Sequence, residues 1–323
     1  MILERACVCL AAALVLAPGT HAYAQEVDGG NFILPPGRLE TLLRTEPFSI
    51  IDWRGSRKPD DRTQRAVLLF EDSTLVTAKW ASAPRNGGRF NNEPRYEAAA
   101  YEIQKLFLDA TDYVVPPTII RAFPLDFVTA QVPEHRPTFG DAPRSVVVTL
   151  QYWLFNVQPD NFWQPERVRS DSLYARRIGN FNILTYLIGH LDANAGNFLI
   201  SRDPSDPHVY AVDNGVSFGS EASNRGDMWK DIQVDRLPRS TIDRLARLEG
   251  SDLERALGVL AEFEIRDGEL IPVEPGENFS RNRGVRTRDD RIQFGLTSRE
   301  IRDVEQRLRQ LVGAANGRRY ILF

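Results

Sequence analysis

The chain has 323 residues, of which 40 are Lys or Arg and 44 are Asp or Glu, so its formal net charge at pH 7 is −4. This balance gives no basic surface of the kind that nucleic acids favour, and no nucleic-acid partner is expected. Both cysteines, Cys7 and Cys9, lie in the first ten residues, which excludes a fold held together by disulfides. The basic run 281–288 is interpreted as a solvated loop, as charge runs usually are.

Residues 1–24 have the layout of a secretory signal peptide. The basic residue Arg5 precedes an apolar run over 6–17, and small side chains follow at Ala22 and Ala24. A membrane anchor is the alternative, but a transmembrane helix needs about 20 apolar residues and this run is much shorter. We therefore expect cleavage after Ala24 and a secreted or periplasmic protein with no transmembrane segment.

The first half of the remaining chain predicts a small antiparallel sheet with one helix. A polar leader segment over 25–45 is expected to come before it. Runs of β-branched and apolar residues predict the strands 48–53, 66–70, 73–80, 114–120 and 145–154. The second and third of these are joined by a short turn and should pair. A proline at the first turn favours a helix over 94–108.

The second half has a helical pattern. Apolar residues at three- and four-residue steps form one stripe along a helix that ends near His190. Capping boxes at 251–254 and 297–300 each open another periodic run. The predicted fold class is α+β, with two lobes and a cleft between them. The N-terminal lobe, 46–150, is an antiparallel sheet plus one helix, and the C-terminal lobe, 151–323, is mainly helical.

One predicted hairpin carries polar residues at its open end. Its arms are 198–200 and 209–212, with a turn rich in Asp-Pro between them. Asn197 opens one arm and Asp213 ends the other, so the two side chains should lie close together across the ladder. Their oxygen atoms suit a hard divalent cation. Asp192 lies one loop away, where it can face a substrate hydroxyl.

Phosphoryl transfer needs a carboxylate for the hydroxyl proton, amide and carboxylate ligands for a metal, and a lysine for phosphate oxygens. The Asp-x-x-x-x-Asn spacing of Asp192 and Asn197, followed by Asp213-Asn214-Gly215, resembles the catalytic loop and metal-binding turn of the protein-kinase-like superfamily. The Asp-Asn-Gly form resembles its atypical branch. That branch includes the secreted Golgi casein kinases and xylosylkinases, the phosphatidylinositol 3- and 4-kinases and the bacterial persistence-toxin kinases.

The resemblance extends over roughly residues 48–315 and assigns roles in the first half of the chain. It implies a bilobal protein-kinase-like fold in which Lys79, at a strand end, anchors the phosphates. Glu97, on the next helix, would pair with that lysine, and Glu102, further along the helix, is the alternative partner. Gln151 and Tyr152 would belong to the hinge that lines the adenine pocket.

Two departures from the family pattern stand out. The loop after the first strand has only Gly55, next to Ser56, where protein kinases carry several glycines over the phosphates. In atypical relatives Arg-His commonly follows the catalytic aspartate, whereas here Ala193-Asn194 follow Asp192. The second departure removes a positive charge near the phosphates, which is consistent with a slow or an inactive enzyme.

The leading interpretation is a secreted, metal-dependent atypical kinase. It would use ATP with Mg²⁺ or Mn²⁺ and transfer the γ-phosphate to a hydroxyl of a protein, glycan or lipid. A pseudokinase that binds a nucleotide or a partner without turnover is the second interpretation, because ATP is scarce outside the cytoplasm. A metal-dependent phosphohydrolase with the same Asp and Asn ligands is the third, but it leaves Lys79 and Glu97 without a role.

Overall fold

The computed structural model of the protein describes residues 30–55, 63–89, 93–192, 196–219 and 228–323. The expected signal peptide with its cleavage position at Ala24, and also Ser56, Ala193 and Asn194, lie outside the described residues. No helix within the described ranges has both the length and the apolar character needed to span a membrane.

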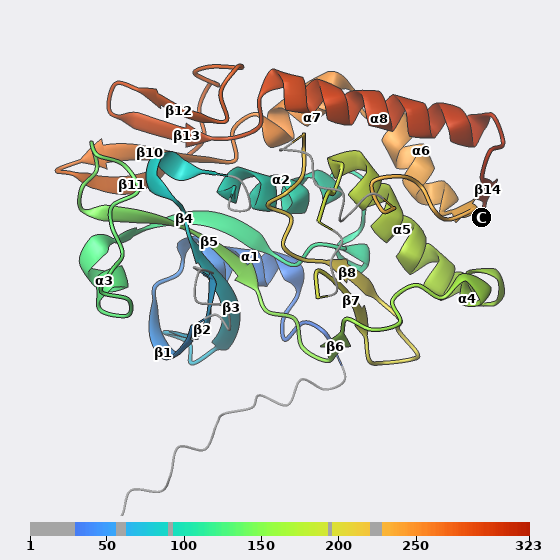
Figure 1. Ribbon diagram of the computed structural model, residues 1–323, viewed down its shortest axis with the longest axis horizontal. Coiled ribbons are helices and arrows are strands. Elements are labelled where there is room, and N and C mark those ends of the chain that lie inside the picture. Colours follow the sequence, from blue (N-terminus) through green and yellow to red (C-terminus); the bar gives the residue numbers. More distant parts are fainter. Residues whose placement is uncertain (1–29, 56–62, 90–92, 193–195, 220–227) are drawn as a thin grey trace, which may run out of the picture.

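A five-stranded antiparallel sheet forms the N-terminal lobe (Figure 1). Its strands follow the order β1-β2-β3-β5-β4 and are β1 (Phe48–Arg54), β2 (Thr63–Phe70), β3 (Leu75–Ser82), β4 (Thr118–Pro124) and β5 (Ser145–Tyr152). The antiparallel pairing predicted for the second and third strands is present, with Val67 opposite Thr77. All eight residues of β5 are buried, in agreement with the buried strand that the sequence predicts.

Side-chain alternation gives this sheet two different faces. On β3, the buried residues Val76, Ala78 and Trp80 belong to an apolar cluster, while Thr77 and Lys79 point to the opposite side. Helix α1 (Pro36–Thr45) covers the apolar face through three fully buried leucines, Leu39, Leu42 and Leu43. The segment 25–45, expected as a polar leader, therefore contains a helix of the hydrophobic core.

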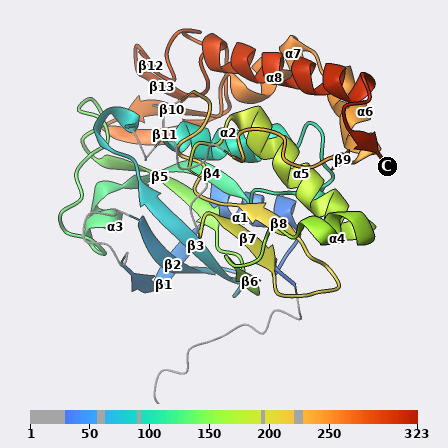
Figure 2. The same cartoon turned by 45° about the vertical axis from the view of Figure 1, so that its right-hand side comes forward.

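Helix α2 (Pro94–Gln104) lies on the other face of the sheet and starts at the predicted proline. It ends four residues before the predicted end at 108. The helix packs against β4 and β5 on one side and against α5 and α7 on the other, so it lies in the middle of the molecule (Figures 1 and 2). A short helix, α3 (Leu125–Thr129), follows β4. The N-terminal lobe thus has more helices than the one predicted.

The C-terminal lobe contains the three helices that the sequence pattern predicts, which are α5 (Ser172–Ile188), α7 (Gly250–Leu257) and α8 (Ser298–Asn316). It also contains two helices that were not predicted, α4 (Pro165–Ser170) and α6 (Arg239–Arg247). Gly189 ends α5 in the left-handed region, with φ at 58°. The predicted capping box of Thr297 and Glu300 opens α8. The box of α7 is formed by Glu249 and Asp252, two residues earlier than predicted.

Three small sheets complete the fold. The predicted hairpin is formed by β7 (Phe198–Ser201) and β8 (Val209–Ala211), with β6 (Val157–Gln158) beside β7. β9 (Arg236–Leu237) and β14 (Ile321–Leu322) pair in parallel. A four-stranded antiparallel sheet, unexpected in a mainly helical lobe, has the order β11-β10-β13-β12 and consists of β10 (Ala261–Arg266), β11 (Glu269–Val273), β12 (Val285–Arg288) and β13 (Arg291–Phe294).

The basic run 281–288 is only in part the solvated loop that its charge suggests, although most of its residues are exposed. Its last four residues form β12, and Arg286 is only 2% exposed. The guanidinium of Arg286 donates hydrogen bonds to the carbonyl oxygens of Arg283, Gly258 and Leu296. Each of its three nitrogens thus has a carbonyl acceptor, which lowers the cost of burying a charged side chain at this place.

Candidate active site

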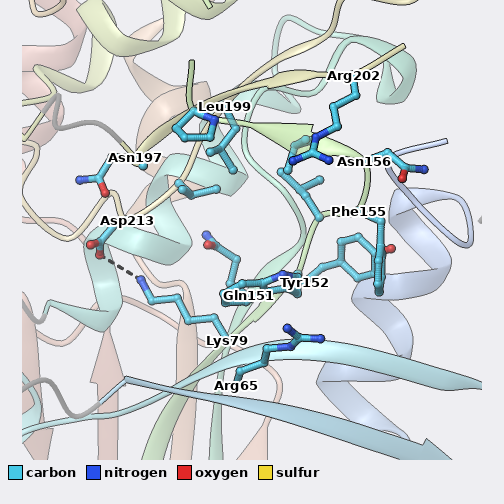
Figure 3. Close-up of a pocket in the computed structure, with 16 residues that line it drawn as sticks. Arg65, Lys79, Gln151, Tyr152, Phe155, Asn156, Asn197, Leu199, Arg202 and Asp213 are labelled. Atoms are coloured by element: carbon cyan, nitrogen blue, oxygen red, sulfur yellow. Dashed lines mark hydrogen bonds and ion pairs between the residues drawn. The ribbon is translucent and has the colours of Figure 1, made fainter. Parts of the chain in front are cut away.

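A cavity of about 730 Å³ lies between the N-terminal sheet and the β7–β8 hairpin (Figure 3). Arg65 of β2, Lys79 of β3 and Gln151 of β5 line it from the sheet. Asn197 and Asp213 line it from the two ends of the hairpin. The cavity therefore brings together residues that are more than a hundred positions apart in the chain, and they include the predicted site residues Lys79, Gln151, Tyr152, Asn197 and Asp213.

The wall formed by the sheet is a row of register partners. Arg65 lies opposite Lys79, Lys79 lies opposite Gln151, and Gln151 lies opposite Thr118. Partners directly opposite each other in an antiparallel sheet point to the same face. The apolar residues on the other face pack on α1, so the pleat of the sheet turns this polar row toward the cavity.

Lys79 is the electrostatic centre of the site. Its Nζ lies 3.1 Å from Oε1 of Glu97 on α2 and 2.9 Å from Oδ1 of Asp213. The predicted ion pair with Glu97 is therefore present, and the alternative partner, Glu102, pairs instead with Lys105 and Arg44. The other oxygen of Glu97, Oε2, accepts a hydrogen bond of 2.9 Å from the backbone N–H of Asn214. One glutamate thus connects α2, β3 and the Asp-Asn-Gly turn.

The pKa values of these three groups are shifted by burial and by one another. Burial acts against the charge of Lys79, but Asp213 and Glu97 outweigh it and raise the pKa of this lysine above its ordinary value. Lys79 lowers the pKa of Asp213. Burial raises the pKa of Glu97, and the opposing effect of Lys79 offsets only part of this. At neutral pH Lys79 and Asp213 therefore remain charged.

The open end of the hairpin holds the predicted trio of polar residues. The N–H of Val212 donates to the carbonyl of Asn197 at 2.8 Å, so Asn197 and Asp213 are near neighbours, as the ladder argument predicts. The Nδ2 of Asn197 donates to the backbone oxygen of Asp192 at 2.9 Å and lies 3.3 Å from its Oδ2. Asp213 has φ at 60°, in the left-handed region, at the sharp bend before Gly215.

His190, to which the sequence assigns no role, supports Asp192. It is completely buried against Phe198, and its Nδ1 accepts a hydrogen bond of 3.2 Å from the N–H of Asp192. Burial lowers the pKa of His190 to about 4, so the ring is neutral at pH 7 and carries its proton on Nε2. This buried imidazole fixes the backbone at the position of the predicted base.

Asn197 and Asp213 carry the donors that a hard cation needs. Because Asn197 turns its amide nitrogen toward Asp192, its carboxamide oxygen is on the side of Asp213 (Figure 3). In the part of the chain that the structure describes, no group of three or more His, Cys, Asp or Glu side chains is arranged to hold a metal ion. Asn197 and Asp213 could therefore supply one amide and one carboxylate oxygen to a hard divalent cation.

Gln151 and Tyr152 line the cavity in different ways. The Nε2 of Gln151 donates to Oγ1 of Thr118 at 2.9 Å, within the polar row. The ring of Tyr152 stacks on Phe32 on the far side, and its hydroxyl accepts from the N–H of Ile33. Tyr152 therefore presents only its backbone to the cavity.

The hinge backbone offers one amide to a ligand. The N–H of Tyr152 donates to Pro117 and that of Trp153 donates to Thr77. Across the described ranges, the N–H of Leu154 makes no hydrogen bond, and Leu154 lines the cavity. Leu154 is thus the first hinge residue with a backbone donor available.

Two residues remain to be placed relative to the cavity: Gly55 of the predicted phosphate loop, and Arg65, which was not predicted. Gly55 is exposed and follows Arg54, the register partner of Arg65, so it lies at the Lys79 end of the sheet without lining the cavity. Its role stays a prediction. Arg65 was missed by the sequence analysis, although counting back from the turn at 71–74 gives the register that places it opposite Lys79.

Comparisons with known proteins give structural matches only, since no protein-family model and no curated protein matches the chain. The structure of hydra Fam20 with sugar superposes with a TM-score of 0.53 and 14% identity, over 89% of this chain and 92% of that chain. The Golgi casein kinase with Mn and ADP bound gives a TM-score of 0.47 and 15% identity, over 86% of this chain and 74% of that chain. The similarity to the Fam20 structure confirms that this chain has the bilobal α+β fold of the atypical protein-kinase-like proteins.

Proposed function

We propose that the protein is a metal-dependent kinase, secreted or periplasmic, that transfers the γ-phosphate of ATP to a hydroxyl of a protein, glycan or lipid. The observation that carries the proposal is the position of Lys79. Its ammonium lies between Glu97 and Asp213 on the wall of a cavity whose opposite side holds Asn197. A lysine held by a helix glutamate and facing a metal-binding aspartate is the phosphate anchor of kinases.

Lys79 would bind phosphate oxygens. Glu97 is 9% exposed and holds the ammonium from the α2 side, whereas Asp213 is 51% exposed and lies on the cavity side. A phosphate group arriving in the cavity can therefore take the place of Asp213 at Lys79 without disturbing the contact with Glu97. Asp213 is then available to a metal ion.

Asn197 and Asp213 would hold Mg²⁺ or Mn²⁺. The metal would neutralise charge on the β- and γ-phosphates during transfer. Asp213 brings a negative charge to the cavity wall beside Asn197, and carboxylate and carboxamide oxygens are the ligands that such a cation prefers. The hydrogen bond of 2.8 Å from the N–H of Val212 to the carbonyl of Asn197 keeps Asn197 and Asp213 close together.

Asp192 would act as the general base. Its backbone is held by His190 and Asn197, and its Oδ2 faces the Asn197 amide. The acceptor oxygen forms a bond to the γ-phosphorus, the bond to the β,γ-bridging oxygen breaks, and the hydroxyl proton passes to the Asp192 carboxylate. ADP is the leaving group. The base of the nucleotide would lie at the hinge, with the N–H of Leu154 as its hydrogen-bond donor.

The test separates binding from chemistry. Calorimetric titration of ATP with Mg²⁺ or Mn²⁺ gives the affinity, and release of labelled phosphate to water or to the protein itself gives the turnover. Asp192→Asn should keep nucleotide affinity and lower turnover by roughly 10²–10⁴, the usual size of a general-base contribution. Asp213→Ala removes an anionic metal ligand and should weaken both. Asp203→Asn, a half-buried aspartate in the turn of the hairpin that does not line the cavity, is the matched control.

Each outcome points to one function. Equal nucleotide affinity in wild type, Asp192→Asn and Asp213→Ala would remove Asp213 from the metal site. Tight binding by the wild type without transfer or slow hydrolysis would make the protein a pseudokinase. Phosphate release from ATP that persists when Lys79 is replaced by Met would favour the phosphohydrolase, since that activity has no use for Lys79 and Glu97.

A further inference from the structure

A second cation faces the cavity beside Lys79. Arg65 of β2 is the register partner of Lys79 of β3, and the two side chains rise from neighbouring strands on the same wall (Figure 3). No other residue of β2 lines the cavity in the described part of the chain. The sheet therefore presents two positive charges side by side to whatever ligand enters.

The two cations differ in their partners. Lys79 is held by two carboxylates, those of Glu97 and Asp213. Arg65 has no ion pair with any residue that the structure describes, and its Nε is buried without a hydrogen-bond acceptor. Its guanidinium lies over the ring of Trp153, whose centroid is 5.3 Å from Cζ.

The burial of Nε without an acceptor is costly, because its N–H has lost water without gaining a partner. Stacking on Trp153, which is 40% exposed, recovers only part of this cost. The five donors of arginine form a planar fork that matches two oxygens of a phosphate. The site thus has an arginine prepared for an anion.

We propose that Arg65 is a second phosphate-binding residue, which contacts the β- or γ-phosphate of the nucleotide next to Lys79. This inference rests on the proposed function of the cavity. Charge supports it as well. ATP carries more negative charge than Lys79 and one divalent cation can neutralise, and Lys79 shares its single charge with Glu97.

The alternative role for Arg65 is to form a platform with Trp153 for the nucleobase or ribose. The two roles differ in how the affinity depends on the number of phosphates. A phosphate contact affects triphosphates and leaves adenosine unchanged, whereas a platform affects every ligand that carries the base. Inorganic tripolyphosphate isolates the phosphate contact, because it has no base.

The experiment is calorimetric titration of ATP, adenosine and inorganic tripolyphosphate into the wild type, Arg65→Met and Arg65→Lys. Arg65→Met should bind ATP and tripolyphosphate roughly 10–100-fold more weakly, the usual effect of a charge-assisted hydrogen bond, with adenosine affinity unchanged. Arg65→Lys keeps the charge but loses the planar fork of donors, so its affinity for ATP and tripolyphosphate should lie between those of the wild type and Arg65→Met. Arg38→Met is the matched control, since Arg38 of α1 is exposed, paired with Asp72, and absent from the cavity wall.

Equal losses for ATP and adenosine in Arg65→Met, with a melting temperature like that of the wild type, would overturn the proposal in favour of the platform. If Arg65→Met does not fold, the same comparison is made with Arg65→Lys: equal losses of affinity for ATP and adenosine would again favour the platform. Wild-type binding of tripolyphosphate that depends on Arg65, without any binding of ATP or adenosine, would refute the kinase and support Arg65 as a phosphate residue. A wild type that binds none of the three ligands would overturn both proposals.

Discussion

Glu300 holds the N-terminal end of α2, and its removal should be severely destabilising. Its Oε2 accepts hydrogen bonds from Nη1 of Arg95 at 2.7 Å and from the N–H of Thr297 at 2.7 Å, and its Oε1 accepts from the hydroxyl of Tyr96. The side chain is 12% exposed and that of Arg95 is 11% exposed. The perturbation we consider is Glu300→Ala.

The magnitude follows from what the substitution leaves behind. Arg95 loses its shorter ion pair and keeps Glu93 at 3.1 Å, and the buried hydroxyl of Tyr96 loses the acceptor provided by Glu300. Removing one partner of a buried pair typically costs about 3–5 kcal/mol, and loss of the capping box adds about 1 kcal/mol. We therefore expect the free energy of unfolding to fall by about 4–6 kcal/mol.

The assay is urea denaturation followed by tryptophan fluorescence. The control is Glu305→Gln on α8, the helix that also carries Glu300. Glu305 pairs with Arg309 at 3.6 Å, and the two side chains are 36% and 48% exposed, so the control should lose no more than about 0.5 kcal/mol. Glu300→Gln keeps one acceptor oxygen and should recover part of the loss. A decrease below about 1 kcal/mol in Glu300→Ala would show that the network around Arg95 contributes little, and the reasoning would be refuted.

Two further predictions concern stability. Leu42→Ala on α1 should lower the free energy of unfolding by about 2–5 kcal/mol, since Leu42 is 1% exposed, whereas Thr41→Ala on the exposed side of the helix should change it by less than about 0.5 kcal/mol. Burial lowers the pKa of His208 to about 3 and that of His190 to about 4. The stability that these neutral histidines contribute is present above about pH 6.5 and is lost as the pH falls, because only the unfolded chain takes up the protons. Unfolding measured between pH 7 and pH 5 should show a loss of about 2 kcal/mol for each histidine, and His208→Gln should remove about half of it; an unchanged slope in that variant would contradict the burial argument.

Local patterns were sufficient for much of the site. The strand that carries Lys79, the helix that carries Glu97 and the hairpin between Asn197 and Asp213 all depend on residues close in the sequence. Short-range periodicity and turn residues determine such elements. Their order along the chain then indicated the fold, which places them around one cavity.

Two other features have local signals in the sequence that did not lead to a prediction. Leu39, Leu42 and Leu43 have helical spacing and start after Pro36, yet one short amphipathic helix next to a polar segment is easily taken for a leader. The Asp267-Gly268 pair between β10 and β11 is a strong hairpin signal, with φ values of 50° and 78°. It shows that the C-terminal sheet was detectable.

Two arginines could not be placed by composition. Arg286 is buried because three carbonyl oxygens from separate segments meet around it, and no local pattern contains that information. Arg65 faces the cavity only because the β2–β3 turn sets its register opposite Lys79. A shift by one residue would have turned it to the face covered by α1.

The contact between Arg95 and Glu300 also determines when this protein can finish folding. The two residues are 205 positions apart, and at the usual rate of synthesis the second emerges roughly 10–40 s after the first. A second long-range contact is the hydrogen bond that the hydroxyl of Tyr210 donates to the carboxamide oxygen of Asn31, 179 positions away. During this interval Arg95 can pair with Glu93 but not with Glu300, so the N-terminal end of α2 completes its native contacts only after Glu300 is available. A chain stopped before residue 300 would therefore lose its structure first in the opposite lobe, at the helix that positions Glu97.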